Sequence, residues 1–504
     1  MENKDVKRNN MINQTIVVSR NAWTTLAILS GTLLTVFFSE TMLLPAIPDI
    51  ITDLNITYGT AAWIFSAYLI VAAVMTPIAG RLSDLYGKKK VLLTLLAVYI
   101  AGLAAGGFAD NITMLLATRI IQGFGLAAIP AAFSLLRDTF PPAKLSIAVG
   151  VFGSAYSAGS VIGLLIGATI IQHFGWHATF LAIIPFSIIV ALLIAKFVKE
   201  QNNPSKISNQ ANDTKSAKAG GRSSILDFKG IITLSATITS FLIALTAIQI
   251  GITNENIPLI SSSFAISAIS LALFATIERK IFNPFVNLNL LKHKVLLPSY
   301  ILLVATGITM FMIYPTIVQI VRSPAPWGFG GSSVDAANVQ LPFMIAFLIF
   351  ASITPLIINK IGSARPALIG GIISLTGGIG LSLFHSSGIQ LSTSLAIVAT
   401  GLSLTMTATW NLVVSGATKE FTGISVGVGA LLLFIGMAIG PALAGVYMSD
   451  HVTNGPLETY PSPKSYVNIF LTASLLSVIA IVVSLFLIKK TKNIANTSNK
   501  HSDK

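Results

Sequence analysis

Fourteen long apolar stretches constrain this chain more than any other feature of its sequence. Each is about twenty residues long, which is what an α-helix needs to cross the roughly 30 Å apolar core of a bilayer. Apolar and polar residues do not alternate within them, which excludes a transmembrane β-barrel. Only 10% of the 504 residues are charged, against about 25% in soluble domains. The sequence therefore predicts an all-α membrane protein, with helices near residues 24–47, 60–80, 90–108, 113–135, 146–171, 177–197, 230–250, 257–277, 296–320, 338–358, 366–384, 391–413, 423–447 and 466–488.

The basic residues follow the positive-inside pattern of membrane proteins. If the N-terminus lies inside, 29 of the 32 Lys and Arg residues fall in inner loops and tails, and only Arg322 and Lys464 fall in outer loops. The sequence therefore predicts a multi-pass protein of the cell membrane with both termini in the cytoplasm. This topology also explains the net charge of +14. We expect the lipid bilayer, and no nucleic acid, as a partner.

The sequence lacks the signatures of several catalytic chemistries. It contains no Cys, and its six His residues do not have the spacing of metal ligands. It also lacks the Gly-x-x-x-x-Gly-Lys-Ser/Thr segment of nucleotide-binding loops. We therefore expect no enzyme activity, no catalytic residues, no metal, no cofactor and no need for an ATPase subunit. The expected partners are a small-molecule substrate and protons, because ion gradients would have to supply the energy for transport.

Two loops 275 residues apart are similar in sequence. Segment 80–90 reads Gly-Arg-Leu-Ser-Asp-Leu-Tyr-Gly-Lys-Lys-Lys, and segment 355–365 reads Pro-Leu-Ile-Ile-Asn-Lys-Ile-Gly-Ser-Ala-Arg. An internal repeat of this kind predicts two similar halves around a central cavity, which is a transporter architecture. The predicted parts are a cytoplasmic tail at 1–23, a six-helix half at 24–198, a cytoplasmic linker at 199–229, an inserted helix pair with its loop at 230–294, a second six-helix half at 295–488 and a cytoplasmic tail at 489–504.

The loop at 80–90 is the most specific motif of the chain. A tight turn between two helices favours Gly, and a positive-inside loop explains the lysines, but neither explains the Gly-Arg-x-x-Asp-x-x-Gly spacing. The loop resembles the signature loop of the major facilitator superfamily, which helps to close the cytoplasmic face in that family. The resemblance implies a cytoplasmic gate formed by Gly80, Arg81, Asp84, Gly87 and Lys88.

Two further motifs narrow the resemblance to the fourteen-helix drug:proton antiporters of that superfamily. Segment 39–48, Ser-Glu-Thr-Met-Leu-Leu-Pro-Ala-Ile-Pro, resembles their first-helix motif, with Glu40 where Asp is usual. Segment 119–125, Arg-Ile-Ile-Gln-Gly-Phe-Gly, resembles their fourth-helix motif. Multidrug, quaternary-ammonium and tetracycline exporters belong to this group. The resemblance covers about residues 24–488 and implies the major facilitator fold, with two six-helix halves and two inserted helices.

Glu40 is the only Asp or Glu inside any of the predicted helices. A carboxyl group within a bilayer is costly and is functional by default, although a structural ion pair or a side chain that reaches out to water would also explain it. Counted along their helices, Glu40 and Arg119 both lie about 10 Å below the outer surface. We therefore expect Glu40, Arg119 and Gln122 to couple protons to the substrate, with a Glu40–Arg119 interaction that is direct or runs through water or Gln122.

Small-residue motifs lie in the fifth and thirteenth predicted helices. The fifth-helix motif of the drug antiporters is reduced here to Gly159 and Gly163, with Ser160 in place of Pro and Leu164 in place of the last Gly. The thirteenth helix carries the fuller form, which consists of Gly436, Gly440, Pro441 and Gly445. Both motifs are also explained by close packing of helices alone. The reduced fifth-helix motif leaves the direction of coupling open.

Polar and aromatic residues within the predicted helices are candidates for lining a cavity, although packing and lipid contact also explain them. They are Trp63, Tyr68, Tyr156, Tyr314, Gln319, Trp410 and Asn411. The resemblance implies a secondary active transporter that exports lipophilic, cationic drugs or related small molecules in exchange for protons, by alternating access. A symporter or uniporter of the same fold, for an organic acid, sugar or peptide, is an alternative. A non-transporting membrane receptor is a third.

Overall fold

The structure is a computed structural model that describes residues 18–199, 228–250, 254–281, 293–417, 422–450, 452–454 and 459–502. Within these ranges it is helical apart from one short β-hairpin, and 14 helical segments are long and apolar enough to cross a membrane. The all-α membrane fold predicted from the apolar stretches is confirmed. The predicted linker at 199–229 and the tail at 1–23 lie mostly outside the described residues.

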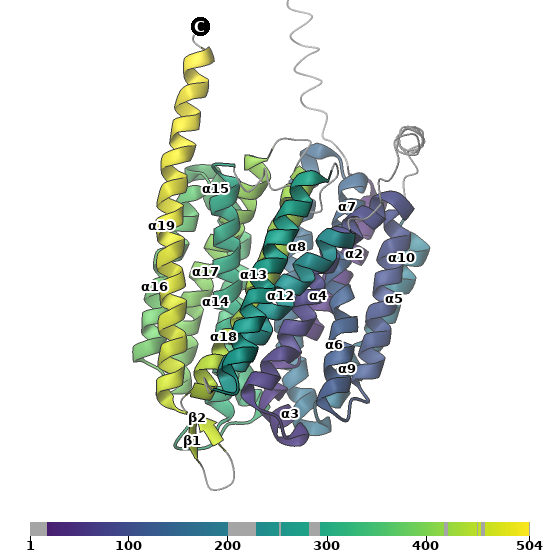
Figure 1. The fold of residues 1–504 in the computed structure, drawn as a ribbon. Helices are drawn as coiled ribbons and strands as arrows, with labels where there is room; N and C mark the ends of the chain where they lie inside the picture. The colour runs from purple at the N-terminus through teal and green to yellow at the C-terminus, as the bar shows by residue number, and fades with distance from the viewer. Residues whose placement is uncertain are drawn as a thin grey trace, which may run out of the picture.

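The helices form two bundles that stand side by side, with the N-terminal bundle in purple and blue and the C-terminal bundle in green and yellow (Figure 1). The N-terminal bundle contains α2 (Arg20–Thr41), η1 (Leu44–Ala46), α3 (Ile47–Leu54), α4 (Tyr58–Tyr86), α5 (Lys88–Gly106), α6 (Ile112–Ala127), α7 (Ile129–Thr139), α8 (Pro142–Phe174), α9 (His177–Ala182) and α10 (Ile184–Phe197). Three predicted spans are broken into shorter helices here. In each, a Pro stands at the start of the second piece, where its missing N–H costs least.

The C-terminal bundle contains α14 (Leu296–Arg322), α15 (Ser333–Ile361), α16 (Ala364–Leu383), α17 (Gly388–Gly416), α18 (Thr422–Asp450), the antiparallel strands β1 (Val452–Asn454) and β2 (Thr459–Pro461), and α19 (Pro463–Ser502). Between the bundles in sequence come α12 (Phe228–Ile250) and α13 (Ile257–Lys280). Helix α19 continues well beyond the predicted end of its span, because no Pro or Gly interrupts residues 489–502.

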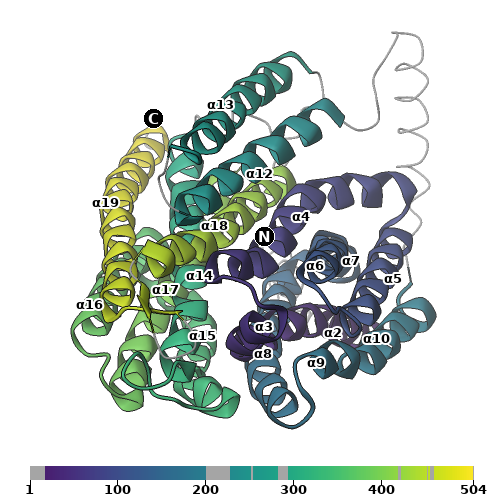
Figure 2. The same cartoon turned by 60° about the horizontal axis from the view of Figure 1, so that its bottom comes forward.

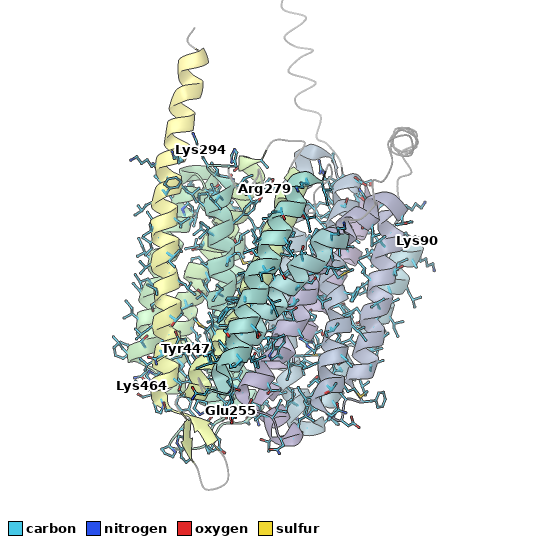
Figure 3. All side chains as sticks on the ribbon, in the orientation of Figure 1. Lys90, Glu255, Arg279, Lys294, Tyr447 and Lys464 are labelled. Atoms are coloured by element: carbon cyan, nitrogen blue, oxygen red, sulfur yellow. The ribbon has the colours of Figure 1, made fainter. Side chains whose placement is uncertain are left out.

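The two ends of the molecule differ in charge. The end at which α19 terminates, here called the tail side, carries Lys90, Arg279 and Lys294, whereas Lys464 and Glu255 lie at the opposite end (Figure 3). That opposite end also carries α3 and the β-hairpin (Figure 1) and is here called the hairpin side. The concentration of basic residues at one end agrees with the loop assignment made from the sequence.

Two pairs of long helices make the main contacts between the bundles. Helix α4 packs against α18, and α8 packs against α15. The inserted helices lie along one side of the molecule, where α12 covers both α4 and α18, and α13 packs against α12 (Figure 2). One seam between the bundles is therefore covered by the inserted pair. At the α8–α15 seam, the short helix η1 contacts both α8 and α15.

The two similar loops also have similar backbone geometry. Gly87 joins α4 to α5 with φ of +97°, and Gly362 joins α15 to α16 with φ of +78°. Residues with a side chain rarely adopt this left-handed region. In both turns the Gly N–H donates to a carbonyl four residues earlier, that of Ser83 or Ile358. The repeat seen in the sequence is thus a repeat of turn geometry.

Candidate functional site

Glu40 lies in the last turn of α2, where the span breaks before it continues through η1 and α3 to Leu54. Its side chain is only 3% exposed, and neither carboxyl oxygen has a hydrogen-bond partner among the described residues. A buried charge without a partner is costly. The carboxyl group therefore needs compensation by a proton, by Arg119 or by a bound cation.

Arg119 is fully buried on α6 and is fixed by groups from its own bundle. Its Nε donates to the main-chain carbonyl of Ile64 at 3.0 Å, and its Nη1 donates to Gln122 Oε1 at 2.9 Å. The guanidinium also lies 4.3 Å from the ring centroid of Tyr68, which is a cation–π contact. Gln122 in turn donates to the carbonyl of Gly102 on α5 at 3.0 Å. These contacts leave Arg119 Nη2 without a hydrogen bond.

Glu40 and Arg119 interact through their charges but form no ion pair. They are near enough for a Coulombic interaction, whereas the salt bridges of the described residues are Lys88–Asp138 and Arg322–Asp49. Gln122 binds Arg119 and α5 and makes no hydrogen bond to Glu40. The carboxyl group of Glu40 and the guanidinium of Arg119 therefore interact electrostatically without forming an ion pair.

An aromatic row begins one turn from Glu40 and crosses from one bundle to the other. Its members are Phe37, Tyr156, Phe347, Phe343, Tyr314 and Phe311, in this order. Neighbouring ring centroids are 4.1 to 6.2 Å apart, within the range of favourable aromatic contact. The crossing point is the contact between Tyr156 on α8 and Phe347 on α15, at 6.1 Å. Phe37 lies one turn before Glu40 on α2 and contacts Tyr156, so the acid lies beside the start of this row.

The acid has no counterpart in the second bundle. A Cβ on Gly163 would meet Phe38, and one on Gly440 would meet Ile308, so these contacts are equivalent. Glu40 lies two residues after Phe38, and Met310 lies two residues after Ile308, so Met310 occupies the position equivalent to Glu40. Its sulfur lies 3.9 Å from the hydroxyl of Tyr156. The first bundle therefore brings the acid to the seam, and the second brings an apolar, polarisable side chain.

The small-residue motifs are contacts between helix backbones. A Cβ on Gly159 or Gly163 would lie 2.5 to 2.6 Å from main-chain carbonyl oxygens of α2. A Cβ on Gly436 or Gly440 would lie 2.4 to 2.7 Å from those of α14. Pro441 and Gly445 instead face the α4–α18 seam, where they line a small pocket on the hairpin side. Close packing thus accounts for all four glycines and also fixes α2, the helix of Glu40, against α8.

The predicted gating loop lies on the tail side and is described only in part. The side chains of Arg81 and Asp84 lie outside the described residues. Lys88 donates to the carbonyl of Ser134 at 3.5 Å and pairs with Asp138, both in its own bundle. These Lys88 contacts anchor the loop to α7.

The other candidate residues lie apart from Glu40. Trp63 Nε1 donates to Thr246 on α12 at 2.7 Å and so faces the inserted pair. Gln319 Nε2 donates to Tyr58 Oη at 2.8 Å on the hairpin side. Trp410 packs near Gly429 of α18, and Asn411 accepts a hydrogen bond from Ser363 on the tail side. Of the seven cavity candidates, Tyr68 contacts Arg119, and Tyr156 and Tyr314 belong to the aromatic row.

Part of helix α8 is exposed towards the tail side. Gly150 and Gly153 of α8 are exposed, and no described atom lies within 4 Å of a Cβ placed on either. Gly153 shares a helix face with Leu164 and Ile171, which are buried further along α8. This inward-facing stripe is therefore covered near the hairpin side and uncovered near the tail side.

Sequence reasoning missed several residues of this region. Phe37 precedes Glu40 by three positions and so shares its helix face, which was a usable signal. The partners of Tyr156 in the second bundle, Met310 and Phe347, gave no signal because long-range contacts are not visible in one sequence. Outside this region, Glu278 was also missed, because α13 extends three residues past its predicted end and buries this acid to 3% exposure. Among the described residues no group of His, Asp and Glu could hold a metal ion.

Comparison with known proteins identifies the family. The model of the Major Facilitator Superfamily matches residues 29–342, more than half of the chain. The tetracenomycin C resistance and export protein of Streptomyces glaucescens is 26% identical over 85% of this chain and 76% of that protein. Multidrug resistance protein 3 of Bacillus subtilis (strain 168) is 26% identical over 87% of this chain and 82% of that protein.

The fold of this chain is similar to the folds of solved transporter structures. The human organic anion transporter MFSD10 (TETRAN) aligns with a TM-score of 0.61 at 15% identity, over 92% of this chain and 99% of that one. At this identity the likeness concerns the fold alone. Together, the two bundles, the paired glycine turns and the family match show that this chain belongs to the Major Facilitator Superfamily.

Proposed function

We propose that this protein is a secondary active exporter that exchanges protons for lipophilic, cationic small molecules. The observation that carries the proposal is the buried carboxyl group of Glu40, which has no hydrogen-bond partner and lies beside the aromatic row. A proton and a cation can each neutralise this group, but they cannot do so together. Competition for one acid couples the inward movement of protons to the outward movement of the cation.

The aromatic row supports a lipophilic, cationic substrate. Its rings offer apolar contact area, and ring faces attract cations by about 0.5–2 kcal/mol. Met310 at the crossing point adds a flexible side chain that suits substrates of different shapes. The names of the relatives, a resistance and export protein and a multidrug resistance protein, support export of drugs.

The transport cycle follows from the two bundles. By the positive-inside rule the tail side is cytoplasmic, and the exposed part of α8 at Gly150 and Gly153 would admit substrate from there. Rocking of the bundles then exposes Glu40 to the outer side, where a proton displaces the cation. The protonated protein returns and releases the proton inside. Arg119 stays charged throughout and balances the carboxylate whenever neither proton nor cation is bound.

Uptake by proteoliposomes tests the proposal. Vesicles with an acidic lumen receive a fluorescent lipophilic cation outside, and vesicles without a pH gradient serve as the control. The proposal predicts concentrative uptake only with the gradient, because protons leave as the cation enters. If the vesicles do not take up the lipophilic cation but the pH gradient drives transport of an organic acid, sugar or peptide, the protein is a symporter and the proposal is wrong.

A further inference from the structure

We infer that Asp49 and Arg322 form a latch that closes the hairpin side between the two bundles. Arg322 Nη1 and Nη2 donate to the two carboxylate oxygens of Asp49, each at 2.6 Å. Nη1 also donates to the carbonyl of Pro45 at 2.8 Å. Asp49 lies in the first turn of α3, and Arg322 is the last residue of α14. One guanidinium therefore joins two bundles whose contacting residues are 273 positions apart.

The position of Arg322 needs an explanation that membrane topology does not supply. Positive charges are disfavoured in outer loops, and Lys464 is the only other basic residue assigned there. Lys464 is exposed, whereas the Arg322 side chain is only 16% exposed and is paired. A paired arginine has its charge neutralised, and its planar fork matches a carboxylate in a way that lysine cannot. The bidentate pair accounts for an arginine at this place.

Two further hydrogen bonds cross between the bundles near the latch. Gln319, one turn before Arg322, donates to Tyr58 of α4 at 2.8 Å. Ser333 at the start of α15 donates to the carbonyl of Ala168 on α8 at 3.1 Å. Towards the tail side, by contrast, Gly150 and Gly153 of α8 are exposed. The hairpin side is thus the closed end of this conformation, and Asp49–Arg322 is the salt bridge among the described residues that spans it.

The latch is built to be reversible. The side chains of Arg322 and Asp49 are 16% and 32% exposed, so water can solvate both charges when the bundles separate. Partly exposed ion pairs contribute modestly to stability. Loss of the pair would therefore shift the population towards the outward-open state without unfolding either bundle.

Cysteine labelling tests the latch without any knowledge of the substrate. The chain contains no Cys, so Ala61→Cys is the only thiol in its variant. Ala61 is 2% exposed and lines the small pocket on the hairpin side together with Gln319. A membrane-impermeant maleimide is added to right-side-out vesicles. In this background Asp49→Asn is expected to speed labelling by roughly fivefold or more, because the hairpin side opens more often.

Matched controls separate the latch from a general effect of charge removal. Asp53→Asn changes another acid of α3, which accepts a hydrogen bond from Trp176 of its own bundle at 3.0 Å, and should leave the rate unchanged. Arg322→Gln should speed labelling, and Lys464→Gln should not. The charge swap of Asp49→Arg with Arg322→Asp should restore slow labelling. Equal rates for Asp49→Asn and Asp53→Asn would overturn the latch.

The inference rests on the proposed alternating access only for the motion that opens the latch. Because the labelling needs no substrate, a positive result with no transport of any cation would refute the export proposal and keep the latch. Normal cation export together with an unchanged labelling rate would refute the latch and keep the export proposal.

Discussion

The hydroxyl of Thr41 donates a 2.9 Å hydrogen bond to the main-chain carbonyl of Ser160. This bond ties the residue that follows Glu40 to α8, at the position where the fifth-helix motif of related antiporters carries Pro. The approach is this close because Gly159 and Gly163 present no side chain to α2. The position of the candidate proton-carrying acid is therefore set by the contact between α2 and α8.

The first prediction concerns this contact. A Cβ on Gly163 would lie 2.5 Å from the carbonyl oxygen of Phe38 and from Thr41 Oγ1, so Gly163→Ala must push α2 away from α8. We expect a stability loss of about 1–3 kcal/mol and several-fold slower transport, measured by thermal unfolding in detergent and by vesicle uptake. Gly427→Ala on α18 is the control, because its Cβ meets no described atom within 4 Å. The account fails if both variants behave alike.

The second prediction concerns Arg119. Lysine carries the charge but cannot reproduce the fork that reaches both Ile64 and Gln122, nor the contact with the Tyr68 ring. Arg119→Lys should therefore lower the free energy of unfolding by about 1–3 kcal/mol, seen as a lower melting temperature. The exposed Arg365→Lys should change it little. Unchanged stability of Arg119→Lys would show that these hydrogen bonds do not hold the cluster.

The third prediction concerns the point where the aromatic row crosses the seam. Removing a ring that faces a bound cation should weaken binding by about 0.5–2 kcal/mol, which is roughly two- to thirtyfold in Kd. We expect this for Phe347→Ala and Tyr156→Ala, measured by equilibrium binding of a radiolabelled lipophilic cation. Tyr156→Phe keeps the ring and loses only the weak contact with Met310, so its Kd should stay within about threefold. A Tyr156→Phe defect as large as that of Tyr156→Ala would contradict a role for the ring.

The fold could be predicted from the sequence because its main determinants are local. Helix lengths follow from the width of the bilayer, and the loop repeat follows from two glycines that adopt positive φ, Gly87 and Gly362. Helix ends were less predictable, because α2 ends at Thr41, before the predicted end at residue 47, and α3 then continues to Leu54. The same limit applies to Glu278, which a window of apolar residues places at the edge of its span.

The candidate site was predictable only within each bundle. The motifs of the first and fourth helices indicated Glu40, Arg119 and Gln122, and the structure gathers these in one region. Contacts across the seam have no such signal, since Tyr156 meets Met310 from 154 residues away. The Asp49–Arg322 pair was equally hidden, although an isolated arginine in an outer loop was the clue that the charge count offered.

The central claim is that Glu40 carries the exchanged proton. Its most direct test is a pH-sensitive dye inside proteoliposomes that receive a pulse of lipophilic cation. The account predicts that cation entry drives protons out, that Glu40→Gln abolishes this response, and that Glu255→Gln, which changes an exposed acid on the hairpin side, leaves it intact. A folded Glu40→Gln protein that still moves protons in response to the cation would contradict the account.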